Sequence, residues 1–345
     1  MAAAQTPPLG PLAQVRSMGI TLPVYTCGAT PVPGGTCCPG LTSLDGFVAS
    51  GGMALDPARH RLYAADFENN RVQVFDSQSL ARVGLISALG SSGALNLPVD
   101  AALDADGNLY VADLGNEAVE KFDANLHYVA SIAAGKGLSI VGVWAEGDSV
   151  YFSTLQNYVY RYTQGVSGYS ASATFGEPGQ LNHPNQIVKS GNWLYVTDTY
   201  NDRLVKFDVD HPGPVPTQVV GCLLIPTGLR PDATGKWLLE ESDNGGYPAY
   251  VDTFSHDFSL LKSRCVFPDT WSAVQDPATG RTFVSGMNSL SVTVLQGCGP
   301  ATPVPPTATP TLTPIPPPSP TATPVPGGAR ASTAARPNLS RNGQP

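Results

Sequence analysis

The sequence predicts an all-β protein, a six-bladed β-propeller of four-stranded antiparallel blades. A module of about 44 residues recurs six times between Ser50 and Leu295, and a fixed period of this size is typical of radial β-repeats. Apolar and polar residues alternate within each module, and Asp-Pro, Asp-Gly and Gly-Asn pairs separate the alternating runs. Alternation with a period of two predicts strands joined by tight turns.

The period can be measured from the bulky residue in the second predicted strand of each module. The spacings between successive residues of this kind are 47, 41, 44, 43 and 45. The residues themselves are Tyr63, Tyr110, Tyr151, Tyr195, Leu238 and Phe283. Modules of this number and length form one closed unit that can bury a large apolar core.

The chain is predicted to contain three segments. Residues 1–45 form an N-terminal segment with a ring-closing strand and a Cys-rich loop, 46–298 form the propeller, and 299–345 form a Pro/Thr-rich stalk and a disordered tail. The last module offers strands for only three of the four places in its blade, which would leave an unpaired sheet edge. The N-terminal run Gly19–Tyr25 is therefore expected to supply the missing strand and close the ring.

The cysteines, even in number and without the spacing of a zinc site, predict disulfides and an oxidising compartment. The candidates are Cys27, Cys37, Cys38, Cys222, Cys265 and Cys298. The last of these is expected to bond to one of the first three across the ring closure. A bond between Cys222 and Cys265, one module apart, stays open: they occupy equivalent places in successive blades, and it requires their α-carbons to lie within about 7 Å of each other.

The expected location is extracellular or at the cell surface, although residues 1–8 lack the basic and apolar parts of a secretory signal. The Thr/Pro stalk is similar to those of bacterial secreted domains. The formal net charge is −8, and no cluster of Lys and Arg is present that could neutralise phosphates, so nucleic acid is not an expected partner. We expect a monomer without a transmembrane segment that binds a protein or a small-molecule ligand.

The residues that face the central channel are predicted to lie on the innermost strands, where the modules differ from one another. The candidates for ligand binding at the channel mouth are Asp100, Trp144, Asn185, Thr227, Asp269 and Trp271. Two indoles with a few polar groups suit a small ligand with an apolar face, such as a sugar or an aromatic compound. The alternative is that these side chains only fill or solvate the channel.

Other polar residues recur from module to module and are expected to be structural. Asp66, Asp113 and Asp198 directly follow the second strand, where a carboxylate can accept hydrogen bonds from the N–H groups of a turn. Arg71 and Arg203 recur in the third strand and are expected to brace neighbouring modules rather than to bind a substrate.

The modules resemble the NHL-repeat family, whose units have a Gly-rich lead-in, a Pro before the innermost strand, a Leu-Tyr-Val-Ala-Asp core and an Asn-Arg-Val-Gln-Phe-like third strand. Residues 109–113 (Leu-Tyr-Val-Ala-Asp), 69–75 (Asn-Asn-Arg-Val-Gln-Val-Phe) and 175–184 (Phe-Gly-Glu-Pro-Gly, then Leu-Asn-His-Pro) carry the likeness. On such a rigid ring, we expect the irregular loops Glu241–Tyr247 and Gly165–Thr174 to provide recognition on one face.

Two enzymatic alternatives stay open. A propeller lactonase that resembles the gluconolactonase family would need a glutamate, an asparagine and an aspartate around one divalent cation such as calcium; Asp100 and Asn185 could contribute, but no glutamate stands at a matching place. An amidating lyase of the NHL fold would need zinc held by several histidines, and only His183 stands at the start of an innermost strand. The sequence therefore predicts a non-catalytic binding scaffold without a metal site or cofactor, with a metal-dependent hydrolase or lyase as the alternative.

Overall fold

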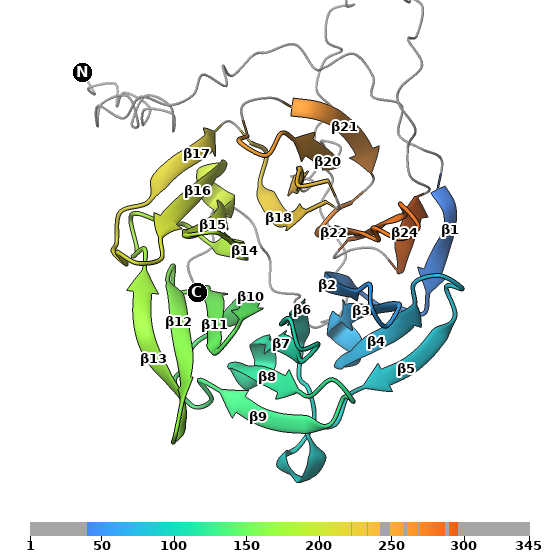
Figure 1. The fold of residues 1–345 in the computed structure, drawn as a ribbon, viewed down its shortest axis with the longest axis horizontal. Coiled ribbons are helices and arrows are strands. Elements are labelled where there is room, and N and C mark those ends of the chain that lie inside the picture. Colours follow the sequence, from blue (N-terminus) through green and yellow to red (C-terminus); the bar gives the residue numbers. More distant parts are fainter. Residues whose placement is uncertain are drawn as a thin grey trace, which may run out of the picture. The chain divides into compact units, whose positions relative to one another are not determined.

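The computed structural model describes residues 40–221, 223–232, 234–241, 249–258, 261–267, 269–286 and 290–295, with the backbone alone for 40–42 and 261–266. All of them belong to the first of the chain's two units, Met1–Gly299. Within these residues, 24 strands form six four-stranded antiparallel sheets arranged as blades around one axis (Figure 1). The predicted fold class is confirmed.

The first three blades follow one another along the chain. Blade 1 comprises β2 (Ser50–Asp56), β3 (Arg61–Asp66), β4 (Arg71–Asp76) and β5 (Arg82–Ile86). Blade 2 comprises β6 (Pro98–Leu103), β7 (Leu109–Asp113), β8 (Ala118–Phe122) and β9 (Tyr128–Ile132). Blade 3 comprises β10 (Ile140–Glu146), β11 (Ser149–Thr154), β12 (Val159–Gly165) and β13 (Gly168–Phe175). In each blade the first strand is innermost.

The last blade combines strands from both ends of the ring. Blade 4 comprises β14 (Pro184–Ser190), β15 (Trp193–Asp198), β16 (Arg203–Asp208) and β17 (Thr217–Gly221). Blade 5 comprises β18 (Pro226–Pro231), β19 (Trp237–Glu241), β20 (Ala249–Phe254) and β21 (Leu261–Phe267). Blade 6 comprises β22 (Ser272–Gln275), β23 (Thr282–Ser285), β24 (Ser291–Leu295) and β1 (Gly40–Asp45). Short 3-10 turns are η1 (Phe67–Asn69), η2 (Gly90–Ser92), η3 (Leu114–Asn116) and η4 (Thr199–Asn201).

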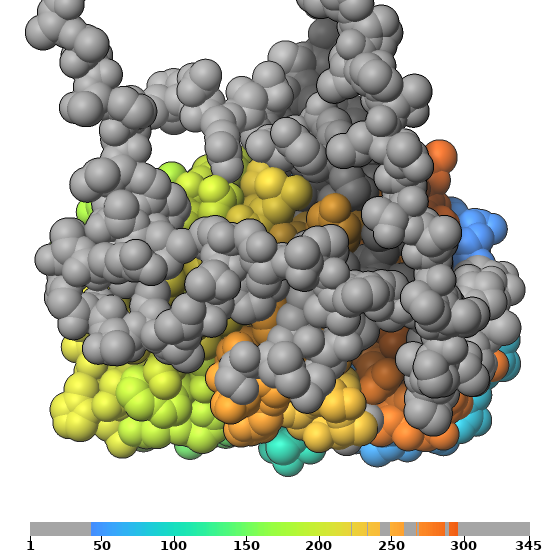
Figure 2. Space-filling view, turned by 90° about the horizontal axis from the view of Figure 1, so that it is seen from above, coloured from blue at the N-terminus to red at the C-terminus, as the bar shows by residue number. Residues whose placement is uncertain are grey.

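An N-terminal strand closes the ring as expected, but it is not the predicted one. β1 pairs with β24 from Gly40 opposite Leu295 to Asp45 opposite Ser291, and Figure 2 shows the blue of β1 beside the orange of blade 6. The prediction of Gly19–Tyr25 for this place is wrong, and that run lies outside the described residues. The physical reason is the connection: only residues 46–49 separate β1 from β2, whereas a strand that ends at Tyr25 would need a much longer link.

The apolar core lies between the blades. Six clusters of buried apolar side chains each join two successive blades, including the closing pair of blades 6 and 1, where Leu44 of β1 packs with Met53 and Phe283. The smallest cluster among the described residues joins blades 5 and 6. Alternation in the sequence produces this arrangement, because each strand presents successive side chains to the two neighbouring blades.

The outer strands of all six blades carry a one-residue irregularity in their pairing. Examples are the shifts between Val74 and Phe75 opposite β5 and between Lys121 and Phe122 opposite β9. A bulge bends a strand and interrupts its free row of backbone groups, which blunts an exposed edge against pairing with another chain.

The two ends of the ring differ in the connections that they carry. We call the end where the inner strands begin the front face; it also carries the turns from second to third strands. The opposite end is the back face. The β12–β13 turn within Gly165–Thr174 lies on the back face. The other predicted recognition loop, Glu241–Tyr247, lies outside the described residues except for Glu241, so a shared recognition face stays a prediction.

All six cysteine side chains lie outside the described residues, as do residues 299–345, so the structure leaves the predicted disulfides and stalk as predictions. Among the described helical segments, none has the length and hydropathy required to cross a membrane.

Candidate functional site

The predicted channel residues lie on or directly before the inner strands. Asp100 (β6), Asn185 (β14) and Thr227 (β18) are 2%, 3% and 2% exposed. Trp144 lies on β10, and Asp269 and Trp271 precede β22; these three are half-buried. The inner strands thus place all six candidate residues around one axis. The contacts of each candidate side chain differ from blade to blade.

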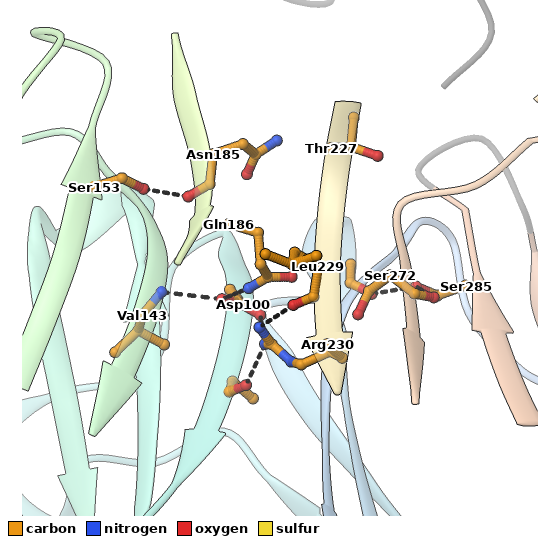
Figure 3. Close-up of polar contacts among 12 residues, drawn as sticks. Asp100, Val143, Ser153, Asn185, Gln186, Thr227, Leu229, Arg230, Ser272 and Ser285 are labelled. Atoms are coloured by element: carbon orange, nitrogen blue, oxygen red, sulfur yellow. Dashed lines mark hydrogen bonds and ion pairs between the residues drawn. The ribbon is translucent and has the colours of Figure 1, made fainter. Parts of the chain in front are cut away.

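Asp100 is the centre of a buried hydrogen-bond network (Figure 3). Its Oδ1 accepts a hydrogen bond from Nη2 of Arg230 at 3.2 Å. Its Oδ2 accepts from the backbone N–H of Val143 at 3.0 Å and from Nε2 of Gln186 at 2.5 Å. The donors come from blades 3, 4 and 5, so four of the six blades meet at this carboxylate.

Arg230 reaches Asp100 from the opposite side of the ring. Blades 2 and 5 face each other across the axis of a six-bladed ring (Figure 1). Arg230 is 6% exposed and also donates to the carbonyl oxygens of Leu229 and Ala101 at 3.2 and 3.3 Å. The carboxylate of Asp100 lies where a Cβ on Gly52 would stand, so a glycine on blade 1 provides its space. The protein's own side chains therefore cross the channel at this level.

The electrostatics of this network favour a structural role. Burial raises the pKa of Asp100, and Arg230 together with the donors on Val143 and Gln186 opposes that rise. A buried ion pair returns its desolvation cost only when the remaining polar atoms are hydrogen-bonded. Here Asp100 accepts three such bonds, which leaves little of its carboxylate for an external ligand.

Asn185 and Thr227 lie nearer the front face (Figure 3). The carbonyl of Asn185 accepts a hydrogen bond from the Ser153 hydroxyl, and its side-chain Nδ2 is buried without a hydrogen-bond partner. The Thr227 hydroxyl makes a long contact of 3.5 Å with the carbonyl of Glu240. The side chains of Asn185 and Thr227 therefore make fewer and longer hydrogen bonds than the side chain of Asp100.

The two indoles do not form a common platform for a ligand. Trp144 packs against the apolar clusters between blades 3 and 4 and between blades 4 and 5, and its buried Nε1 has no hydrogen-bond partner. Trp271 donates its backbone N–H to the carbonyl of Ser285 at 2.7 Å. Part of the Trp144 side chain therefore belongs to the apolar core. This agrees with the alternative that the channel candidates fill space rather than bind a ligand.

His183 has the position of an apolar residue. It has a left-handed backbone with φ 57°, as do Leu97 (φ 55°) and Ile225 (φ 45°), and each of the three precedes the proline that begins an inner strand. Both ring nitrogens are buried without a partner, the ring contacts Tyr200 at 4.7 Å between centroids, and burial lowers its pKa. Leu97 and Ile225 pack at the equivalent positions of blades 2 and 5, so packing explains the presence of His183 in blade 4.

The recurring aspartates form one clamp in several blades. Asp66, Asp113 and Asp198 accept the backbone N–H groups of Val48, Asn96 and Asn182 at 3.2, 2.8 and 2.7 Å, which fixes the connection that leads into the blade. In blade 5, Glu241 does the same for Leu224 at 2.6 Å. The expected structural role is supported by these contacts.

An arginine completes the clamp in two blades. Arg71 contacts Asp66, and Arg203 contacts Asp198, each at 2.7 Å. Their second hydrogen bonds go to the carbonyls of Gly46 and Gln180, at 2.8 and 2.5 Å, in the preceding connections. Both arginines therefore brace the ring, as expected.

Three residues of the channel region escaped the sequence-based prediction: Gln186, Arg230 and Glu240. Arg230 occupies a place on β18 that holds Ala54, Ala102 or Trp144 in earlier blades. A charged residue within an apolar inner strand was the available signal. The side chain of Glu240 is 0% exposed, and the signal there was a second glutamate directly before Glu241.

The arrangement offers no evident metal centre. Among the described residues, no group of three or more His, Cys, Asp and Glu side chains is placed to hold a metal ion. The aspartate that a lactonase-like site would need is already engaged, because Asp100 is bonded to Arg230 and Gln186.

Comparison with known proteins identifies the fold only. No family model and no curated protein matches the chain. The structure of U3-55K has a TM-score of 0.57 at 11% identity, covering 74% of this chain and 98% of that one; the WD40 repeats of RRP9 give 0.58 at 11%, covering 76% and 99%. A gluconolactonase from Xanthomonas campestris, XC5397, gives 0.57 at 18%, covering 79% and 99%. These likenesses support a β-propeller, and they leave the NHL-repeat resemblance as a prediction.

Proposed function

We propose that the protein is a non-catalytic propeller scaffold that binds a protein or a small molecule through its loops rather than through the channel. The observation that carries this proposal is the Asp100–Arg230 pair, because it crosses the channel with the protein's own side chains. A site that had to admit a substrate at this level would first have to break a buried ion pair, which costs about 3–5 kcal/mol.

The front face supports the proposal with exposed apolar side chains. Val48 is 41% exposed and Leu290 is 66% exposed. The two lie close together, because the backbone N–H of Phe47 donates to the carbonyl of Leu290 at 3.3 Å. Adjacent exposed apolar residues are a more informative surface feature than single ones. We propose that this pair, at the joint of blades 6 and 1, belongs to the recognition surface.

The surface part of the proposal is tested by affinity capture with the whole chain as bait. The double variant Val48→Glu/Leu290→Glu should lose a partner that the wild type retains. Val83→Glu is the matched control, because Val83 is 49% exposed on the outer strand β5, away from the front face. Equal retention by the double variant would contradict this assignment of the surface.

The non-catalytic part is tested by metal analysis and by an assay with a sugar lactone. The purified protein, equilibrated with calcium or zinc and then dialysed, should hold less than one equivalent of metal and should not accelerate lactone hydrolysis. One tightly held equivalent that is lost in Asp100→Asn and kept in the exposed control Asp106→Asn would favour the hydrolase or lyase alternative.

The proposal includes an extracellular or cell-surface location with disulfides. Pairing of Gly40 with Leu295 brings together backbone positions that are two and three residues along the chain from Cys38 and Cys298. Alkylation before and after reduction, read by mass spectrometry, should reveal cysteines that react only after reduction. Alkylation of all six without reduction would contradict this part of the proposal.

A further inference from the structure

One position of the second strand carries a polar side chain in four of the six blades. It directly precedes the position of the clamp carboxylate, and its residues are Ala65, Ala112, Ser153, Thr197, Glu240 and Ser285. In three blades the side chain is a hydroxyl that donates to a carbonyl on the inner strand of the next blade. The donor and acceptor pairs are Ser153 with Asn185, Thr197 with Thr227 at 3.4 Å, and Ser285 with Gly51 at 2.6 Å.

Blade 3 shows how this contact is built. Gly142 on the inner strand pairs with Ser153 on the second strand. A Cβ on Gly142 would overlap the carbonyl oxygen of Asn185 and would lie 2.8 Å from Oγ of Ser153. The missing side chain of the glycine therefore leaves the space in which the serine hydroxyl meets the next blade.

Blade 5 repeats the geometry with a different chemical group. Gly228 pairs with Glu240. A Cβ on Gly228 would overlap Oε2 of Glu240 and would lie 2.7 Å from the carbonyl oxygen of Trp271 on the next blade. The carboxyl group thus stands in the place of the serine hydroxyl and faces the equivalent carbonyl. An ionised carboxylate has no proton to donate there, whereas a neutral carboxyl group has one.

The surroundings of Glu240 oppose its ionisation. The residue is 0% exposed, and neither Oε1 nor Oε2 makes a hydrogen bond of ordinary geometry. Arg230 on β18 and the Ala273 amide on β22 favour the charged form, and Asp252 on β20 opposes it. Burial dominates these effects and raises the pKa of Glu240 to about 8. The described residues of β22 add no charged group near it.

We propose that Glu240 is held as a neutral carboxylic acid that donates its proton to the Trp271 carbonyl, so that the joint between blades 5 and 6 tightens in acid and loosens in alkali. When the proton leaves to solvent, the carboxylate faces a carbonyl oxygen at close range and repels it.

The direction of the effect follows from the two pKa values. The ordinary carboxyl value applies to the unfolded chain, and the folded value is about 8. The stabilising contribution of Glu240 is therefore complete below the ordinary value and is lost as pH rises through about 8. Between the ordinary carboxyl value and about 8, the equilibrium constant for opening this joint should rise about tenfold per pH unit, and above about 8 it should level off.

Infrared spectroscopy of the whole chain tests the protonation state directly. In an Asp113→Asn background at pH 6, the protein should show a C=O band of buried neutral carboxyl groups that loses intensity on adding Glu240→Gln, and this part of the band should disappear as pH rises through about 8. A spectrum in which the two proteins have the same carboxyl band at pH 6 would overturn the proposal.

Hydrogen exchange tests the consequence for the joint. All proteins should carry Asp113→Asn, because the pKa of Asp113 is raised to about 7 and would titrate in the same range. After correction for the intrinsic rate, exchange of the Trp271 amide, which donates to the Ser285 carbonyl, should accelerate about tenfold per pH unit between pH 6 and 8 in this background and should level off above pH 8. It should not accelerate in Glu240→Gln or Glu240→Ser. The serine variant copies blade 3, so it keeps a neutral donor if the glutamine variant folds poorly.

The exposed Glu68 provides the matched control, since Glu68→Gln should leave the acceleration unchanged. Acceleration of the same size in the Glu240 variants would overturn the proposal, as would its absence in the parent protein.

Discussion

Asp113 in blade 2 and Asp198 in blade 4 hold the same place in the ring but have different surroundings. Each is 0% exposed, and each accepts the backbone N–H of the connection that leads into its own blade. Arg203 pairs with Asp198 across the strands, whereas blade 2 has Ala118 at the matching position. Burial raises the pKa of both carboxyl groups; Arg203 opposes the rise in Asp198, and without such a cation the pKa of Asp113 reaches about 7.

The two blades show that the clamp requires the carboxyl group but not the arginine. The carboxyl group that holds the incoming connection is present in both blades, together with an asparagine, Asn116 or Asn201, that donates to it at 2.6 or 2.9 Å. The arginine is optional for the fold, and where it is present it favours the charged form of the carboxyl group. Repeated polar residues can therefore serve the scaffold while differing in their response to pH.

Removal of the complete clamp should have the largest effect. Asp198→Ala leaves Arg203 and the backbone N–H of Asn182 without their acceptor, and removing one partner of a buried pair costs about 3–5 kcal/mol. Asp113→Ala leaves no cation unpaired and should cost about 1–3 kcal/mol. Urea unfolding of both variants at pH 7 measures the difference. Equal losses of unfolding free energy would show that Arg203 does not change the contribution of the clamp carboxylate to stability.

A change of pH should affect the blade without the arginine more strongly. Because the folded pKa of Asp113 is about 7 and the ordinary value is 3.8, its stabilising contribution is complete below 3.8 and is lost as pH rises through about 7. Relative to Asp113→Asn, the wild type should therefore lose free energy of unfolding between pH 5 and pH 8. Unfolding curves at both pH values measure this, and a difference that is independent of pH would contradict the assignment.

Adding the missing cation should have the smallest effect. Ala118→Arg places a guanidinium where Arg203 stands in blade 4, and should raise the free energy of unfolding at pH 8 by up to about 1 kcal/mol and lower the pKa of Asp113. The melting temperature at pH 8 and the NMR titration of Asp113 are the measurements. Ala118→Met controls for side-chain bulk. An arginine variant no more stable than the methionine variant would contradict the claim that the missing cation explains the difference between blades 2 and 4.

The repeat predicted the ring because its signals are local. Alternating residues and turn pairs specify strands such as Leu109–Asp113 without reference to distant parts of the chain. The closing strand was assigned to the wrong run because Gly19–Tyr25 has the stronger strand pattern, whereas Gly40–Asp45 is selected by the short connection from β1 to β2. Connection length is a property of the folded ring that pattern alone does not show.

The candidate site was predicted only in part, because its central contact joins distant residues. Asp100 was recognised as a singular inner-strand carboxylate, but its partner Arg230 is 130 residues away and lies on the opposite blade. Alignment of the inner strands would have revealed Arg230 as the charged residue in an apolar series. The neutral state of Glu240 could not be anticipated in this way, because it depends on burial and on the glycine beside it.

The most direct test of the account is a double-mutant cycle on Asp100 and Arg230, measured by urea unfolding at pH 7. If the pair closes the channel, Asp100→Asn and Arg230→Met should each cost about 3–5 kcal/mol, and the double variant should cost at least about 2 kcal/mol less than the sum. Losses that add within error, or single variants as stable as the wild type, would contradict the claim that this ion pair holds the centre of the ring.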